Sequence, residues 1–167
     1  MLGSNSNKKG SDRKGARQNL TDLLVTMPLF DKLNVDELTS LRRYVSMIEV
    51  PAGDIVFQEG DPGNYVCFVA EGKLTVFKKG FGDEKTVLAT IPSGRCIGEM
   101  ALVDQFARSA SAVAKVDSRL IVLSRENFDD ICEHHPKLAN KVLREIARLV
   151  SLNLRKTSAN LVNLSSS

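Results

Sequence analysis

The sequence predicts a mainly β domain with helices at both ends, and two observations support this prediction. Between residues 45 and 123, short runs rich in β-branched and aromatic residues alternate with turns that contain glycine or proline, at a spacing of about ten residues. Apolar residues recur with helical periodicity only before and after this stretch. Regularly spaced short strands of this kind are typical of a sandwich or barrel.

The chain of 167 residues has the length and composition of one globular domain with flanking segments. Residues 1–18 carry five lysines and arginines against one aspartate, a net charge of +4; the whole chain carries +3, so the remainder carries −1. We expect this basic tail to be disordered, because it has almost no large apolar side chains. A solvated tail is favoured over one that contacts nucleic acid or an anionic membrane, and the near-neutral remainder lacks a global basic field.

The cysteine pattern and the absence of long apolar runs predict a cytoplasmic protein without membrane-spanning segments. Cys67, Cys96 and Cys132 are widely spaced and form no paired CxxC motif. No stretch approaches the roughly 20 apolar residues that cross a bilayer, and the N-terminus has no signal-peptide core. Cys67 and Cys96 have no histidine nearby in the sequence, so we expect them to be core residues, not nucleophiles.

Two helices are expected before the strands. The first is marked by Leu20, Leu23, Leu24 and Met27, and Pro28 follows it. The second starts after Asn34, because a cap residue followed three positions later by Glu37 is the pattern of a capping box.

Seven strands and two C-terminal helices complete the predicted order. The expected strands cover residues 45–50, 54–57, 65–70, 73–78, 86–91, 110–116 and 119–123. Ser124 is a helix cap, and the helix that it starts is expected to run to His134. Pro136 takes the favoured first-turn position of the last helix. The apolar face of this helix closes the domain, which we place at residues 19–154, with residues 155–167 as a tail or a helix extension.

One segment interrupts the strand pattern and carries the candidate chemistry. Gly98–Val103 is short and helix-compatible, and Arg108 follows it before the next strand. The N-terminus of such a helix presents unpaired backbone N–H groups that can bind an anion, which Gly98 allows to approach closely. Arg108 offers a planar guanidinium that can contact two oxygens of one phosphate. Glu99, an acceptor when ionised, suits a sugar hydroxyl.

The runs Gly98-Glu99-Met100-Ala101-Leu102 and Arg108-Ser109-Ala110 resemble the phosphate-binding cassette of cyclic nucleotide-binding domains. The similarity extends from about residue 29 to residue 154 and includes the turns at 51–54 and 57–61. The resemblance implies an eight-stranded jelly-roll-like β-barrel (a double-stranded β-helix) with N-terminal helices, a short phosphate-binding helix and C-terminal helices. It also implies a regulatory sensor domain that binds cyclic AMP or cyclic GMP, needs no other cofactor and is not an enzyme.

The resemblance also implies a role for each cassette residue. Glu99 matches the residue that holds the ribose 2′-hydroxyl, and Arg108 matches the one that pairs with the cyclic phosphate. Ser109 and backbone amides near Met100 complete the anion site. The predicted ligand-binding set is Gly98, Glu99, Met100, Ala101, Leu102, Arg108, Ser109 and Ala110. Two positions depart from the common pattern, because Ile97 stands where an aromatic residue is frequent and Ala107 where proline is frequent; neither removes a ligand contact.

Two interpretations without ligand binding are alternatives to the binding site. Glu99 and Arg108 could neutralise each other in a structural salt bridge. A domain that keeps the motif without binding would then be a scaffold that acts through protein contacts or dimerisation. Catalysis at a metal has less support, because the only histidines, His134 and His135, are adjacent on a predicted helix, so we expect no metal site.

The last helix could pack on its own barrel, close over a base, or pair with a second copy to form a homodimer. Arg148, Leu149 and Leu152 are candidates for capping the base. In related domains this helix moves on ligand binding, which implies a switch by population shift. No helix-turn-helix follows it, so we expect no direct DNA binding, and the sequence identifies no protein effector. Ser109 does not separate the two bases, and cyclic AMP is favoured.

Overall fold

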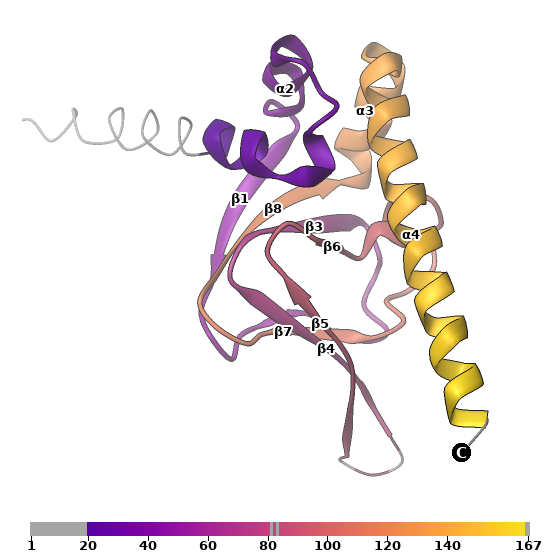
Figure 1. Cartoon of the computed structure of the whole chain (residues 1–167). Helices are drawn as coiled ribbons and strands as arrows, with labels where there is room; N and C mark the ends of the chain where they lie inside the picture. The colour runs from indigo at the N-terminus through magenta and orange to yellow at the C-terminus, as the bar shows by residue number, and fades with distance from the viewer. Residues whose placement is uncertain (1–19, 81, 83, 166–167) are drawn as a thin grey trace, which may run out of the picture.

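Two four-stranded antiparallel sheets form the body of the domain, with helices at both ends of the chain (Figure 1). The computed structural model describes residues 20–80, 82 and 84–165. The strands are β1 (Val45–Val50), β2 (Ile55–Phe57), β3 (Tyr65–Glu71), β4 (Lys73–Lys79), β5 (Lys85–Pro92), β6 (Cys96–Ile97), β7 (Ser111–Ala114) and β8 (Ser118–Ser124). One sheet has the order β1-β8-β3-β6 and the other β2-β7-β4-β5. The predicted fold class is confirmed, as a jelly-roll-like pair of sheets, not a closed barrel.

Helices precede and follow the strands, and their ends are capped where the sequence predicts. Residues 20–26 are helical, followed by η1 (Pro28–Phe30), α2 (Val35–Leu41), α3 (Arg125–His134) and α4 (Pro136–Ser165). Asn34 and Glu37 form a capping box at α2, with both hydrogen bonds at 2.9 Å. The Ser124 hydroxyl accepts from the amide of Asn127 at α3. The predicted tail, residues 1–18, lies outside the described residues.

The core consists of two clusters that share strand β3. Val66 and Phe68 point into a cluster formed with the helices, whereas Cys67 and Val69 point into a cluster between the sheets. This alternation follows from the two-residue period of a strand. It explains why four consecutive residues of β3 are fully buried. Each such side chain contributes on the order of 1.5–3 kcal/mol by leaving water.

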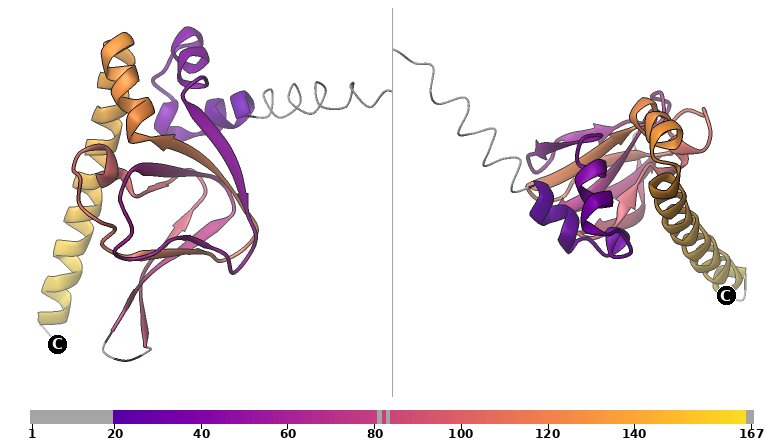
Figure 2. Two further views of the ribbon diagram at one scale, coloured as in Figure 1. Left: turned by 180° about the vertical axis from the view of Figure 1, so that it is seen from behind. Right: turned by 90° about the horizontal axis from the view of Figure 1, so that it is seen from above.

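The helices form one layer at one end of the sheets, and α4 runs on along their side (Figures 1 and 2). Lys141 of α4 binds the Glu37 carboxylate at 2.8 Å, and Lys32 lies 3.5 Å from Glu145 of α4. These ion pairs join α4 to the N-terminal helices. Within the described part of the chain, no helix has the length and apolar character that a membrane crossing requires.

Strand β6 and helix η1 are absent from the sequence prediction. Strand β6 has two residues, paired with Cys67 and Phe68 of β3, which is too short for any periodicity to appear. Its place in the fold matters, because it leads directly into the segment Gly98–Val103.

Candidate functional site

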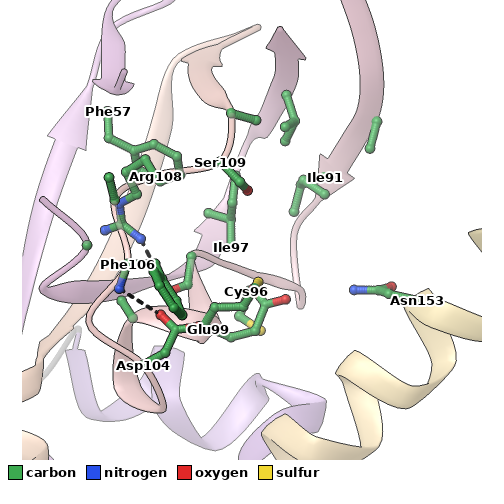
Figure 3. Close-up of a pocket in the computed structure, with 18 residues that line it drawn as sticks. Phe57, Ile91, Cys96, Ile97, Glu99, Asp104, Phe106, Arg108, Ser109 and Asn153 are labelled. Carbon is green, nitrogen blue, oxygen red and sulfur yellow. Dashed lines mark hydrogen bonds between the residues drawn. The ribbon is translucent and has the colours of Figure 1, made fainter. Parts of the chain in front are cut away.

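A cavity of about 400 Å³ opens beside the segment that the sequence analysis singles out (Figure 3). Its walls come from β4, β5, β6, the short helix η2 (Glu99–Leu102), the loop before β7, and α4. Seven of the eight predicted ligand-binding residues line it: Gly98, Glu99, Met100, Ala101, Arg108, Ser109 and Ala110. The eighth, Leu102, is buried among the core side chains under the helices and anchors η2.

Gly98 is placed where any other residue would be strained. Its φ of 75° and ψ of 22° are in the left-handed region that glycine adopts without strain. A Cβ atom here would overlap Nη1 of Arg108 and lie 3.1 Å from its Cζ. The glycine therefore both turns the chain from β6 into η2 and leaves room for the guanidinium.

Arg108 is a buried cation held by neutral groups. Its side chain is only 7% exposed, and its Nη2 and Nη1 donate to the carbonyl oxygens of Tyr65 at 2.6 Å and Gly98 at 3.3 Å. The guanidinium also lies 4.2 Å from the centre of the Phe57 ring and 4.5 Å from that of Tyr65. Its Nε is buried without a hydrogen-bond partner, and no carboxylate of the described residues lies within 4.0 Å of it. The cation therefore retains unused capacity for an anion.

Glu99 is half-buried at the start of η2 and lines the same cavity. Burial raises the pKa of its carboxyl, and the nearby Arg108 charge partly opposes that rise. The two side chains do not form an ion pair, so the structural salt bridge considered as an alternative is not present. No cationic side chain of the described residues therefore pairs with the Glu99 carboxylate.

The wall of the cavity that β4 and β5 form is apolar, and one polar side chain faces it. Val76 of β4 and Ala89 and Ile91 of β5 line it, and Asn153 of α4 faces them across the opening (Figure 3). Sequence reasoning missed Asn153, because nothing in its periodicity shows which turn of α4 passes the cavity.

The three residues suggested for capping a base lie elsewhere. Arg148 pairs with Glu145 in the same helix, Leu149 is buried in the core under the helices, and Leu152 is exposed outside the lining of the cavity.

The cysteines do not add a nucleophile to the site. Burial raises the pKa of Cys67 and of Cys96 to about 12, so both thiols stay protonated at neutral pH. Among the described residues, one group has metal-binding atoms close together, Asp130, Glu133 and His134, and all three are exposed on α3 outside the cavity lining. The imidazole of His134 already pairs with Asp130 at 3.0 Å.

The geometry describes a cavity with an unneutralised buried arginine at one end, a carboxyl beside it and an apolar wall opposite. The family model "Cyclic nucleotide-binding domain" matches residues 47–135, more than half of the chain, and the match contains the whole cassette. The chain belongs to the cyclic nucleotide-binding domain family. The resemblance drawn from the cassette residues is thereby confirmed.

Regulators, channels and kinases are among the relatives of this cyclic nucleotide-binding domain. The chain is 35% identical over 121 residues to a cyclic AMP receptor protein of Thermus thermophilus, covering 72% of this chain and 56% of the relative. It is 31% identical over 137 residues to a cyclic nucleotide-gated potassium channel of Mesorhizobium japonicum, covering 82% of this chain and 35% of the channel. The chain thus spans only part of these relatives.

Solved structures agree with this placement. A cyclic nucleotide-binding domain from Methylobacillus flagellatus superposes with a TM-score of 0.77 at 28% identity, covering 88% of this chain and 83% of that one. The Thermus thermophilus catabolite activator protein gives a TM-score of 0.71 at 34% identity, covering 83% of this chain and 63% of that one.

Proposed function

We propose that this domain is a sensor whose cyclic nucleotide ligand neutralises Arg108. The observation that carries the proposal is the buried guanidinium that lines the cavity without an acidic partner among the described residues. A charge buried in this way is costly unless it is paired. A phosphate would remove that cost through charge-assisted hydrogen bonds, and its oxygens suit the planar donors of arginine.

The rest of the cavity fits the other parts of a cyclic nucleotide. Glu99, beside Arg108, would accept the ribose 2′-hydroxyl, while the Ser109 hydroxyl would add a donor to the phosphate. The apolar wall of β4 and β5 would contact the flat face of the base. Each of these roles uses a different chemical property of the cavity, so together they favour a nucleotide over a simple anion.

Cyclic AMP is the ligand that we favour. The Thermus thermophilus relative is named a cyclic AMP receptor protein, whereas other relatives are cyclic GMP-dependent kinases. Asn153 supplies one amide donor and one amide acceptor on the open side of the cavity. An amide of this kind can pair with the adjacent donor and acceptor of adenine, whereas the corresponding edge of guanine presents two acceptors.

The proposed output is non-catalytic and depends on α4. Because Asn153 lies on α4 and the other ligand contacts lie on the sheets, η2 and the loop before β7, a ligand that touches both favours one arrangement of helix and body. The ion pairs of α4 with Glu37 and Lys32 would carry that preference to the N-terminal helices. This is a population shift, with the nucleotide selecting the closed arrangement.

Titration calorimetry of nucleotide-stripped protein tests the proposal. Cyclic AMP, cyclic GMP and linear AMP are compared, since the linear nucleotide separates recognition of the cyclic phosphate from recognition of adenosine. Saturable binding of cyclic AMP that exceeds binding of both other nucleotides is expected. Absence of heat and of thermal stabilisation with either cyclic nucleotide and with cyclic dinucleotides would reject the sensor function.

A second candidate role, dimerisation through α4, is favoured by a separate observation. A stripe that is apolar except for Thr157 repeats along α4 with alternating spacings of three and four residues: Leu143, Ala147, Val150, Leu154, Thr157 and Leu161. Leu154 and Leu161 are 66% and 59% exposed. The flanking positions Ser151, Asn153, Ser158 and Asn160 are uncharged, whereas Arg144 flanks the start of the stripe, so two copies could pair along its C-terminal part without repulsion.

The dimer and the sensor can coexist in one chain, whereas a scaffold would have the dimer alone. Sedimentation velocity across a range of protein concentrations, with and without cyclic AMP, separates them. A monomer at all concentrations would reject the dimer, and a dimer without nucleotide binding would favour the scaffold.

A further inference from the structure

Arg125, the first residue of α3, joins two loops that both border the cavity. Its Nη2 donates to the carbonyl oxygen of Gly63 at 2.9 Å and also to that of Asp104. Gly63 precedes β3, while Asp104 lies in the loop that connects η2 to Arg108. Both loop residues line the cavity, whereas Arg125 does not. This arginine therefore contacts the walls of the site without touching its interior.

The loop that carries Arg108 is held at both ends. At its C-terminal end, the Arg108 amide donates to Asp61 at 2.8 Å and the Arg108 carbonyl accepts from Gly60 at 2.9 Å. At its N-terminal end, the contact from Asp104 to the neighbouring loop runs through the guanidinium of Arg125. Backbone hydrogen bonds join the C-terminal end of the loop to residues 60–61, whereas at the N-terminal end the Asp104 amide donates to the Met100 carbonyl oxygen at 2.9 Å and the Arg125 side chain supplies the link to Gly63.

Residues 105–107 are exposed, but hydrogen bonds and backbone contacts connect Asp104 to the arginine. The Asp104 carboxylate accepts from the Phe106 amide at 3.2 Å, and the Phe106 carbonyl is so near Gly63 that a Cβ atom there would lie 2.7 Å from it. Movement of Asp104 would therefore displace Phe106, two residues from Arg108. A chain of direct contacts connects α3 to the cation of the site.

No acidic side chain of the described residues pairs with Arg125, and its Nε is buried without a partner. An ion pair would have explained the residue as a surface charge. Two carbonyl acceptors from separate loops instead indicate a positional role, since a single planar group fixes their relative geometry.

We infer that Arg125 is a positioning residue that holds the Arg108 loop in its ligand-binding geometry and couples this loop to α3. The coupling has a direct route to α4, because only His135 separates the two helices. This inference extends the proposed nucleotide-binding function and rests on it for the effect on affinity. The effect on the loop itself can be measured without any nucleotide.

Hydrogen exchange of the ligand-free protein is the first test, with Arg125→Gln compared with wild type. We expect the amides of residues 104–108 to exchange at least about tenfold faster in the variant, because local opening becomes easier. The matched control is Arg119→Gln, which removes an arginine from β8 that binds the Glu71 carboxylate, outside the cavity lining. Exchange in 104–108 that is unchanged in Arg125→Gln, or raised equally by Arg119→Gln, would overturn the inference.

Nucleotide affinity is the second readout. Arg125→Gln should weaken cyclic AMP binding by about 10- to 100-fold, the usual effect of losing an outer partner that orients a binding group. Arg125→Lys, which keeps the charge and can reach one carbonyl, should recover part of the loss, and Arg119→Gln should bind like wild type. If Arg125→Gln does not fold, Arg125→Lys is measured by exchange and affinity in its place.

A double-mutant cycle with Arg108→Lys decides whether Arg125 acts through Arg108. We expect the two losses to be less than additive, since a loop that no longer presents the guanidinium has little left to lose. Fully additive losses would contradict the positioning role. If wild type binds no nucleotide, the proposed function fails, while the exchange experiment still decides the role of Arg125 in the loop.

Discussion

At the scale of single residues, Arg108 combines two properties that ordinary folding would not favour together. It is buried, and it is neutralised by no carboxylate of the described residues. Two carbonyl groups and two aromatic rings partly replace the water that the guanidinium has lost. An arrangement of this kind is expected where stability is given up for binding.

Arg108→Met tests this interpretation, because methionine keeps much of the volume and removes the charge. Nucleotide binding should weaken by about 2–5 kcal/mol, the usual cost of truncating one partner of a buried charge pair. The free energy of unfolding of the ligand-free protein should change by no more than about 1 kcal/mol, since relief of the buried charge offsets the lost hydrogen bonds. Calorimetric titration and urea unfolding measure the two quantities. Unfolding of the ligand-free variant would show that Arg108 is structural.

Glu99 should make nucleotide affinity and protein stability respond to pH in opposite directions. Burial raises the pKa of its carboxyl above the ordinary 4.5. In the pH window between 4.5 and this raised pKa, the folded protein binds more protons than the unfolded chain. The stability that this group contributes is therefore greatest at low pH and falls as the pH rises through the window. Affinity should fall as the pH drops through the same window, because protonation removes the charged acceptor for the ribose hydroxyl.

The Glu99→Gln variant isolates that effect. Its affinity at pH 7 should be lower by about 1.5–3 kcal/mol, the contribution of a hydrogen bond to a charged group. Its affinity should also show a flatter pH dependence than that of wild type between pH 7 and pH 4.5. Titrations of both proteins at several pH values provide the comparison. Parallel pH profiles would assign the dependence to another group.

At the scale of elements, α4 has two faces with different uses. One face packs on the domain through Leu138, Val142, Ile146 and Leu149, which are buried. The stripe that includes Leu154 lies on another face and is exposed. A single helix can therefore pack on its own domain and remain available to a second copy.

Leu154→Glu should dissociate the proposed dimer while leaving the monomer folded. The substitution places a charge at the centre of the apolar stripe, where two copies would bring like charges together. Sedimentation should show a monomer at concentrations where wild type is dimeric. Arg155→Glu, one position along the helix and off the stripe, is the control and should sediment like wild type. Equal sedimentation of Leu154→Glu and wild type would exclude the stripe as the dimer interface.

The sequence predicts most elements of this fold because the signals are local. The capping box at Asn34, the cap at Ser124 and the seven longer strands all follow from patterns within a few residues. Strand β6 has only two residues, so its pairing with β3 comes from tertiary contacts that no local pattern contains. The cassette residues can be recognised from the sequence because they form two short runs close together in the chain. Asn153 and Arg125 cannot, because their positions at the site depend on how helices distant in the sequence pack.

At the scale of the whole molecule, a bound nucleotide should stabilise the fold as one unit. At a free ligand concentration of 100 times Kd, the free energy of unfolding should rise by about 2.7 kcal/mol. For a chain of this size the unfolding temperature should rise by roughly 5–11 °C. Thermal unfolding with increasing cyclic AMP measures the shift, and Arg108→Met should show at most about a third of it at the same concentrations. A wild-type curve that does not move would favour the scaffold.

The two faces of strand β3 pack against different core clusters. Phe57 and Ile97, which line the cavity, belong to the cluster that receives Cys67 and Val69, whereas the helices pack on Val66 and Phe68. The cavity and the helices therefore use opposite sides of β3 for most of their packing, and η2 contacts both sides because Leu102 packs under the helices. This arrangement gives a physical reason why a receptor protein, a potassium channel and a kinase regulatory subunit can all carry related domains. Changes in the helices that pack on the outer side of β3 can leave most of the cavity lining unchanged.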